Sequence, residues 1–229
     1  MRMVAGIDGC PGGWVVVETL TDGDRRTTIE RVSNLDGVIA KLDSGQLAAV
    51  AIDIPIGLPQ AGSRRCDIEA RRMIGARRSS VFPAPARGVL GATTYEAAAA
   101  RSQAISGKRL SRQAFGVLSK IEDVDRVVGP DRQRHLVEVH PEVSFTVLAG
   151  VPMSHHKATA EGRAERLAVL RGPFPDIEIQ AASRITRVKP DDVLDAFVAA
   201  WSARRWLART HIQLGGDVDQ RGLRMEMIA

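Results

Sequence analysis

The chain opens with three short stretches of apolar and β-branched residues, at 4–8, 14–19 and 27–32. Connections as short as those between them favour antiparallel pairing of neighbouring strands. A nearly unbroken apolar run at 47–54 is bounded by Pro55 and is typical of a strand that is buried on both faces. The pattern predicts three antiparallel strands, followed by one strand in the interior of a sheet.

Apolar residues at helical spacing predict several helices in the rest of the chain. Asn34 is the expected cap of a helix that runs through Leu42. A helix over 64–74 is expected to carry Ile68, Ala70, Met73 and Ile74 on its apolar side. The further elements that we expect are helices at 95–105, 111–128, 158–170 and 190–210, a loop at 81–87, a strand at 135–140, and a helix that begins at Pro141.

This order of elements predicts an α/β fold. Its sheet is mixed, with three antiparallel strands and then parallel strands, and helices flank it. We expect a single domain over residues 1–229, with a helical and arginine-rich insertion around residues 60–130. The tail after Leu214 shows no clear pattern.

Composition excludes several classes of protein. Of the 229 residues 44% are hydrophobic, which excludes wholesale disorder. No apolar run approaches the ~20 residues of a membrane span, and the N-terminus lacks the layout of a signal peptide. The two cysteines make no disulfide framework, and an aromatic content of 4% argues against a base-stacking platform of the single-strand-binding kind. We therefore expect a cytoplasmic protein with no membrane partner.

The positive charge of the chain is concentrated in one segment. Between Arg64 and Arg87 there are seven arginines and two acids, a local excess that equals the net charge of +5 of the whole chain. Arginine suits phosphate and carboxylate groups. The alternative is a set of solvated arginines from a genome that prefers arginine to lysine. The candidate phosphate-binding residues are Arg64, Arg65, Arg71, Arg72, Arg77, Arg78, Ser79 and Ser80.

Two aspartates end apolar strands. Asp8 closes the first strand, and Asp53 closes the buried run at 47–54. A carboxylate in such a place is costly unless something compensates it. Two of them on neighbouring strands repel each other, and a divalent cation is the usual compensation.

Further acids open the last helix. Asp191 is the expected N-cap, and Asp192 and Asp195 are three residues apart and share a face. For Asp192, capping explains the acid as well as metal binding does, whereas Asp195 lies beyond the reach of a cap. Glu142 follows a strand and either joins these acids or serves the dipole of its helix. Carboxylates from two strands and one helix are the pattern for two Mg²⁺ or Mn²⁺ ions in phosphoryl chemistry.

Other motifs in the sequence are weaker indications of function. The turn at Gly9–Gly13 is not a phosphate-binding loop of the Walker or dinucleotide type, because a strand follows it and no Gly-Lys-[Ser/Thr] does. Cys10 has no evident base beside it and is interpreted as a small turn residue. His155 and His156 have no partner at metal-ligand spacing and are assigned to a surface loop.

The strings GIDGCPGGWVV, AIDIPIGLP, RRCDIEARRMIGARRSSVFPAPAR, VEVHPEVSF and DDVLDAFVAAW resemble a widespread prokaryotic family, filed as domain of unknown function 429. The resemblance runs from about Val4 to Trp201. The members of that family are described as predicted nucleases of RNase H-like fold. The resemblance therefore implies this fold for the chain.

By position, the resemblance implies that Asp8, Asp53 and the pair Asp192 and Asp195 are catalytic and bind the metals. The glutamate that many RNase H-type enzymes carry on the first helix has no obvious counterpart here, and Glu142 is the residue that we consider as its substitute.

Three functions are therefore weighed. The first is a Mg²⁺- or Mn²⁺-dependent nuclease that acts on nucleic acid by two-metal catalysis. The second is a nucleotide-binding phosphotransferase of the related actin-like fold, favoured by the Asp8-Gly9 turn but disfavoured by a chain of only 229 residues. The third is a non-catalytic protein whose arginines bind an acidic partner.

Overall fold

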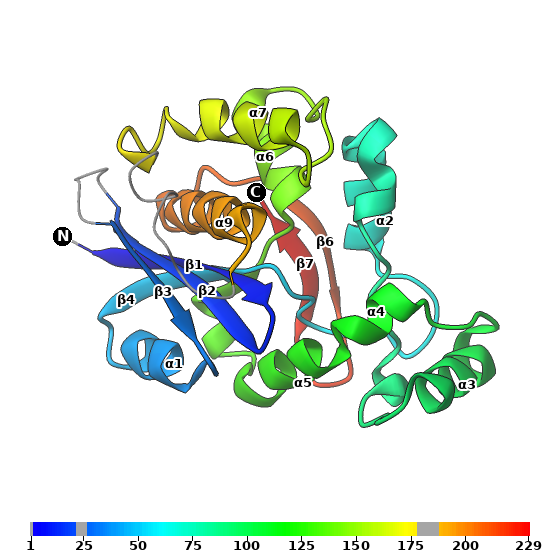
Figure 1. The fold of residues 1–229 in the computed structure, drawn as a ribbon. Coiled ribbons are helices and arrows are strands. Elements are labelled where there is room, and N and C mark those ends of the chain that lie inside the picture. Colours follow the sequence, from blue (N-terminus) through cyan, green and yellow to red (C-terminus); the bar gives the residue numbers. More distant parts are fainter. Residues whose placement is uncertain (1, 22–26, 178–187) are drawn as a thin grey trace.

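A mixed five-stranded sheet forms the centre of the computed structural model, which describes residues 2–21, 27–177 and 188–229 (Figure 1). Its spatial order is β3-β2-β1-β4-β5; β1 pairs antiparallel with β2, as β2 does with β3, while β4 is parallel to both β1 and β5. This confirms the predicted mixed sheet. The strands are β1 (Met3–Cys10), β2 (Gly13–Leu20), β3 (Thr27–Val32), β4 (Leu47–Ile52) and β5 (Leu136–Glu138).

Helices cover both faces of the sheet (Figure 1). On one face lies α9 (Pro190–Ala208), with α6 (Pro141–Ala149) and α7 (Ala160–Leu170) packed against it. On the other face α1 (Asp36–Asp43) and α5 (Leu118–Val127) pack on apolar side chains of β1, β2 and β4. None of the described helices combines the length and the low polarity that crossing a membrane requires.

Strand β1 and helix α9 approach each other at backbone distance. A Cβ atom added to Gly6 would lie 2.1 Å from the carbonyl oxygen of Ala196 and 2.1 Å from the backbone nitrogen of Ala200. Only glycine leaves room for this contact, since any larger residue would push the strand and the helix apart. Gly6 lies two residues before Asp8, and Ala196 directly follows Asp195.

The segment between β4 and β5 is helical, as expected. It holds α2 (Arg65–Met73), a 3₁₀ segment η1 (Gly75–Ser80), a second one η2 (Arg87–Val89), α3 (Tyr95–Ser106), α4 (Arg112–Gly116) and α5, and a short 3₁₀ turn η3 (Arg132–Arg134) precedes β5. The single helix predicted over 111–128 is wrong, because the chain breaks at Val117 between α4 and α5.

The predicted apolar side of α2 is confirmed for Ala70 and Ile74, which are buried, and is wrong for Ile68 and Met73. Ile68 and Met73 are 40% and 36% exposed. Cys66 is buried together with Ala70 and Ile74, because these residues face the C-terminal residues and α6.

The tail that showed no pattern forms a hairpin. Strands β6 (Gln213–Val218) and β7 (Arg224–Ile228) pair antiparallel and pack on α2, and β7 continues to a bridge between Ile228 and Val139 beside β5. Gly215 and Gly216, at φ values of 78° and 119°, lie at a register shift in the pairing. This shift hides the period of two that would have predicted the strand.

Two predicted caps differ in the structure. Leu35 takes the N-cap position of α1, and Asn34 Oδ1 accepts a hydrogen bond from the backbone nitrogen of Asp36 at 3.1 Å. Lys189 is the N-cap of α9, so Asp191 lies in the first turn of the helix and does not cap it. In both cases the chain enters the helix one or two residues away from the predicted cap.

Candidate active site

Parallel pairing brings Asp8 and Asp53 to the same edge of the sheet. Ile7 and Ile52 are register partners on β1 and β4, and the backbone nitrogen of Asp53 donates to the carbonyl oxygen of Ile7 at 3.0 Å. Asp8 is 7% exposed, and the backbone nitrogen of Gly9 donates to its Oδ1 at 2.8 Å. The two carboxylates therefore meet where the sequence placed them.

Helix α9 adds a third carboxylate. Asp195 lies about one turn into the helix and is only 1% exposed. Its Oδ2 accepts a hydrogen bond from Lys157 Nζ at 2.5 Å, whereas its Oδ1 is buried and has no hydrogen-bond partner. A buried carboxylate oxygen without a partner is costly, and a bound cation is one group that would satisfy it.

The three carboxylates destabilise one another in their charged forms. Burial raises the pKa of Asp8 well above its ordinary value, and repulsion by Asp195 and Asp53 raises it further. Burial also raises the pKa of Asp53, and it raises that of Asp195 to about 6. Among the described residues, and with every group ionised, the ammonium of Lys157 faces these three carboxylates. The cluster thus has uncompensated negative charge, which bound divalent cations would offset.

Lys157, which the sequence analysis missed, is the cation in this cluster. It lies in the segment between α6 and α7, and its pKa is raised although burial lowers it, because Asp195 and Asp8 stabilise the ammonium. No spacing in the sequence relates it to the acids. The residue is next to His156, which is exposed as expected.

Replacing Lys157 by methionine is expected to tighten Mn²⁺ binding by about 10-fold or more, because the ion no longer competes with an ammonium for Asp195. Isothermal calorimetry of the purified variant measures this. Lys189→Met removes the same charge at an exposed position and is the control. Equal affinities of the two variants would show that Lys157 and the ion do not share a site.

Glu142 and Asp192 lie beside the cluster with partners of their own. Glu142 Oε1 is hydrogen-bonded to Nη2 of the buried Arg166, while its Oε2 is buried without a partner. Asp192 Oδ2 accepts a hydrogen bond from the backbone nitrogen of Lys189 at 3.2 Å. The capping role considered for Asp192 is therefore present, and Glu142 has one oxygen left for a ligand.

Arg64 does not suit the phosphate-binding role that we expected. It is 2% exposed, and its Nη2 atom lies 2.6 Å from both Asp67 Oδ1 and Glu138 Oε1. Nη1 adds a hydrogen bond to Glu138 Oε2 at 2.7 Å. These contacts occupy the guanidinium, so Arg64 joins α2 to β5 and has no donor to offer a substrate.

The same ion-pair network contains a possible metal-binding group. Among the described residues, one ligand atom each from Cys66, Asp67 and Glu138 lies within 4.8 Å of the others. Arg64 already pairs with both carboxylates, and burial raises the pKa of the Cys66 thiol, which keeps it protonated. A metal ion has no place there. The carboxylates of Asp8, Asp53 and Asp195 are spread more widely, around Lys157.

The other arginines of the segment separate into two sets. Arg77 lines a cavity next to Asp53 together with Ser79 and Ser80. Its Nε donates to the carbonyl oxygen of Met153 at 3.1 Å, and its Nη2 is buried without a partner. Arg71, Arg72 and Arg78 line a separate hollow, and Arg65 pairs with Glu69 at 3.1 Å. Of the six predicted arginines, Arg77 is the one placed to reach an anion at the carboxylates.

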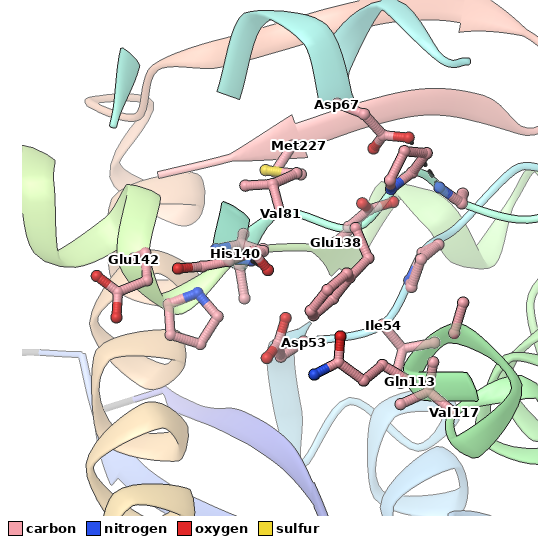
Figure 2. Close-up of a pocket in the computed structure, with 18 of the residues that line it drawn as sticks. Asp53, Ile54, Asp67, Val81, Gln113, Val117, Glu138, His140, Glu142 and Met227 are labelled. Atoms are coloured by element: carbon pink, nitrogen blue, oxygen red, sulfur yellow. Dashed lines mark hydrogen bonds between the residues drawn. The ribbon is translucent and has the colours of Figure 1, made fainter. Parts of the chain in front are cut away.

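The cavity has a volume of about 650 Å³ and extends from Asp53 past His140 toward α4 (Figure 2). His140 Nε2 lies 3.2 Å from the carbonyl oxygen of Ser80, so Nε2 carries a proton, and Nδ1 is buried without a partner. The carboxamide of Gln113 points into the cavity toward Asp53 (Figure 2). No pattern in the sequence marks either residue as part of a site.

Comparison with known proteins identifies a family but no function. The model of the family described as "Protein of unknown function (DUF429)" matches residues 6–220 of the chain. No match was found among the curated proteins or among the solved structures.

Proposed function

The chain belongs to the DUF429 family of proteins of unknown function, and we propose that it is a divalent-metal-dependent nuclease with an RNase H-like fold. The observation that carries this proposal is that the carboxylates of Asp8 and Asp195, both buried, and of Asp53, half-buried, lie near one another, with Lys157 as the cation beside them among the described residues. The proposed reaction is hydrolysis of a phosphodiester bond in nucleic acid.

The architecture supports the proposal. Three antiparallel strands precede two parallel ones, and the acids stand near the end of β1, after β4 and on the last helix. These are the positions that the resemblance to RNase H-like nucleases implies for the catalytic acids.

The donor set suits Mg²⁺ or Mn²⁺. The candidate ligands are all carboxylate oxygens, which these hard cations prefer. Asp195 Oδ1 and Glu142 Oε2 are buried without a hydrogen-bond partner. The negative charge of the carboxylates exceeds the positive charge of Lys157. Two cations bound there would activate the attacking water and stabilise the leaving oxygen.

The remaining residues of the site have distinct roles in this proposal. Arg77, with its unpartnered Nη2, and the hydroxyls of Ser79 and Ser80 hold phosphate oxygens. His140 accepts a proton at Nδ1, since its Nε2 is engaged with Ser80. Lys157 stabilises negative charge on the phosphate. Asp192 lies at the rim and keeps α9 capped.

The test combines metal binding with cleavage. Calorimetric titration with Mn²⁺ is expected to show binding by the wild-type protein and at least ~10-fold weaker binding by Asp53→Asn, because a ligand charge is lost. A panel of single-stranded, duplex and branched DNA and RNA is expected to include a substrate that only the wild type cleaves. Absence of Mn²⁺ binding at millimolar concentrations would contradict the proposal. Binding of ATP with Mg²⁺ and no cleavage would favour a phosphotransferase.

A further inference from the structure

The cavity beside Asp53 leads from the carboxylates into a largely apolar recess. Its volume of about 650 Å³ is within the ~300–1,000 Å³ typical of sites for small molecules and cofactors. Three parts of the chain supply the apolar lining: the loop after β4, the loop after η1, and the junction of α4 and α5. Their main contributors are Ile54, Val81, Phe82, Pro85 and Val117, with Met227 from β7.

Phe82 is the notable member of this lining. Phe82 is 44% exposed, whereas Val81 before it is only 1% exposed. Pro83 follows Phe82 in the chain. Among the described residues, Phe82 is the one aromatic side chain in the set of exposed large hydrophobic residues, and Val117, also in that set, lines the same cavity. An exposed ring on an anchored loop at the mouth of an apolar recess favours a flat ligand that stacks on it.

Polar groups at the recess add a means of recognition. The Gln113 carboxamide points into the cavity (Figure 2), and no hydrogen bond among the described residues engages it. A carboxamide offers both donors and an acceptor, which is what the hydrogen-bonding edge of a nucleobase requires. On the side of the carboxylates, Arg77 has a buried Nη2 atom without a partner, and Ser79 and Ser80 supply hydroxyls. The lining thus combines a stacking surface, an amide and an anion-binding end.

We propose that this recess binds one unpaired nucleobase of the substrate strand, immediately next to the phosphodiester that is cleaved. The base stacks on Phe82, its polar edge meets Gln113, and its phosphate reaches Arg77 and the carboxylates. This inference rests on the proposed nuclease function and adds the class of substrate. A base inside a duplex is paired and stacked and enters such a recess only after extrusion. The preferred substrates are therefore single strands, flaps, bulges or loops.

Two measurements test the recess, and the first needs neither metal nor catalysis. Saturation-transfer NMR with the uncharged nucleosides adenosine, guanosine, cytidine and uridine is expected to show binding to the metal-free wild type. Phe82→Ala is expected to weaken that binding by about 10-fold, and Phe82→Leu by less, because stacking on an aromatic ring is lost. Val151→Ala, which shortens another exposed apolar side chain outside the cavity, is the control and is expected to bind like the wild type.

The second measurement compares cleavage of one oligonucleotide, alone and annealed to its complement, in Mn²⁺. The single strand is expected to be cleaved at least ~10-fold faster, and Phe82→Ala and Gln113→Ala are expected to reduce its cleavage without changing Mn²⁺ affinity. Equal cleavage of both forms, with both variants at wild-type rates, would overturn the recess and leave the nuclease proposal intact. Phe82-dependent nucleoside binding without cleavage of any substrate would support the recess and contradict the nuclease.

Discussion

Asp8→Asn is expected to abolish cleavage and, at the same time, to stabilise the metal-free protein. Cleavage is expected to fall by at least ~10³-fold, because the variant loses one charged ligand of the metal ions. These ions stabilise the negative charge that develops in the transition state. Stability rises because Asp8 is buried beside Asp53 and Asp195, and asparagine removes a charge that has no sufficient compensation. Residues that serve a reaction often reduce the stability of the fold.

The pH dependence of the free energy of unfolding shows whether these carboxyl groups stabilise or destabilise the fold. Asp8, Asp53 and Asp195 all have folded-state pKa values above their ordinary value, mainly because of burial, so the folded protein binds protons more tightly than the unfolded chain does. Their contribution to stability is complete below the unfolded pKa of 3.8 and is lost as pH rises, for Asp195 through about 6. In EDTA, the Asp8→Asn variant is expected to lose less stability over this range than the wild type.

The control for Asp8→Asn is Asp191→Asn, which makes the same chemical change in the first turn of α9. It is expected to keep cleavage near the wild-type rate. Urea unfolding in EDTA at several pH values and a cleavage assay in Mn²⁺ measure both properties. Cleavage that survives in Asp8→Asn would indicate another site or a contaminating nuclease, and a less stable Asp8→Asn variant would contradict the charge argument.

Arg64→Met is expected to destabilise the protein by about 3–5 kcal/mol, because it leaves two buried carboxylates without their cation. Asp67 is 1% exposed and Glu138 is 3% exposed, and both lie 2.6 Å from Arg64 Nη2. Methionine has a similar length, so the loss reports on charge more than on volume. The deficit is expected to shrink at low pH, where protonation neutralises the stranded carboxylates.

Arg65→Met is the matched control, one residue further along α2. Arg65 is exposed and pairs with Glu69 one helical turn away, an arrangement that contributes about 0–1 kcal/mol. Urea unfolding of both variants at neutral and acidic pH measures the difference. If the two variants unfold alike, the buried ion pair does not hold α2 to β5.

The acids of the site were predictable because strand periodicity determines where a strand ends. Apolar runs ending in Asp8 and Asp53 suffice to place both carboxylates at one edge once the two strands pair in parallel. Asp195 was predictable since it stands too deep in its helix for a cap. Each of these predictions depends on local pattern and one pairing.

The places of three residues could not be predicted from the sequence: Lys157, Arg64 and Gln113. Lys157 reaches the acids from a segment without a motif, and Gln113 comes from a short helix far along the chain, so their places depend on tertiary packing alone. Arg64 belongs to a run of arginines that looks uniform in sequence. Its burial depends on Glu138, 74 residues away, which no local pattern relates to it. The clustering of charge marks the segment that contributes arginines to the cavity, but it does not distinguish the buried Arg64 from the others.

The contact at Gly6 has a consequence for the choice of metal ion. Because β1 and α9 touch through backbone atoms at Gly6, Ala196 and Ala200, the separation of Asp8 and Asp195 is set by the main chain and not by repackable side chains. Mg²⁺ demands near-ideal octahedral geometry, whereas Ca²⁺ accepts larger and irregular shells. A carboxylate pair held at a fixed span can therefore discriminate between ions of equal charge by their size.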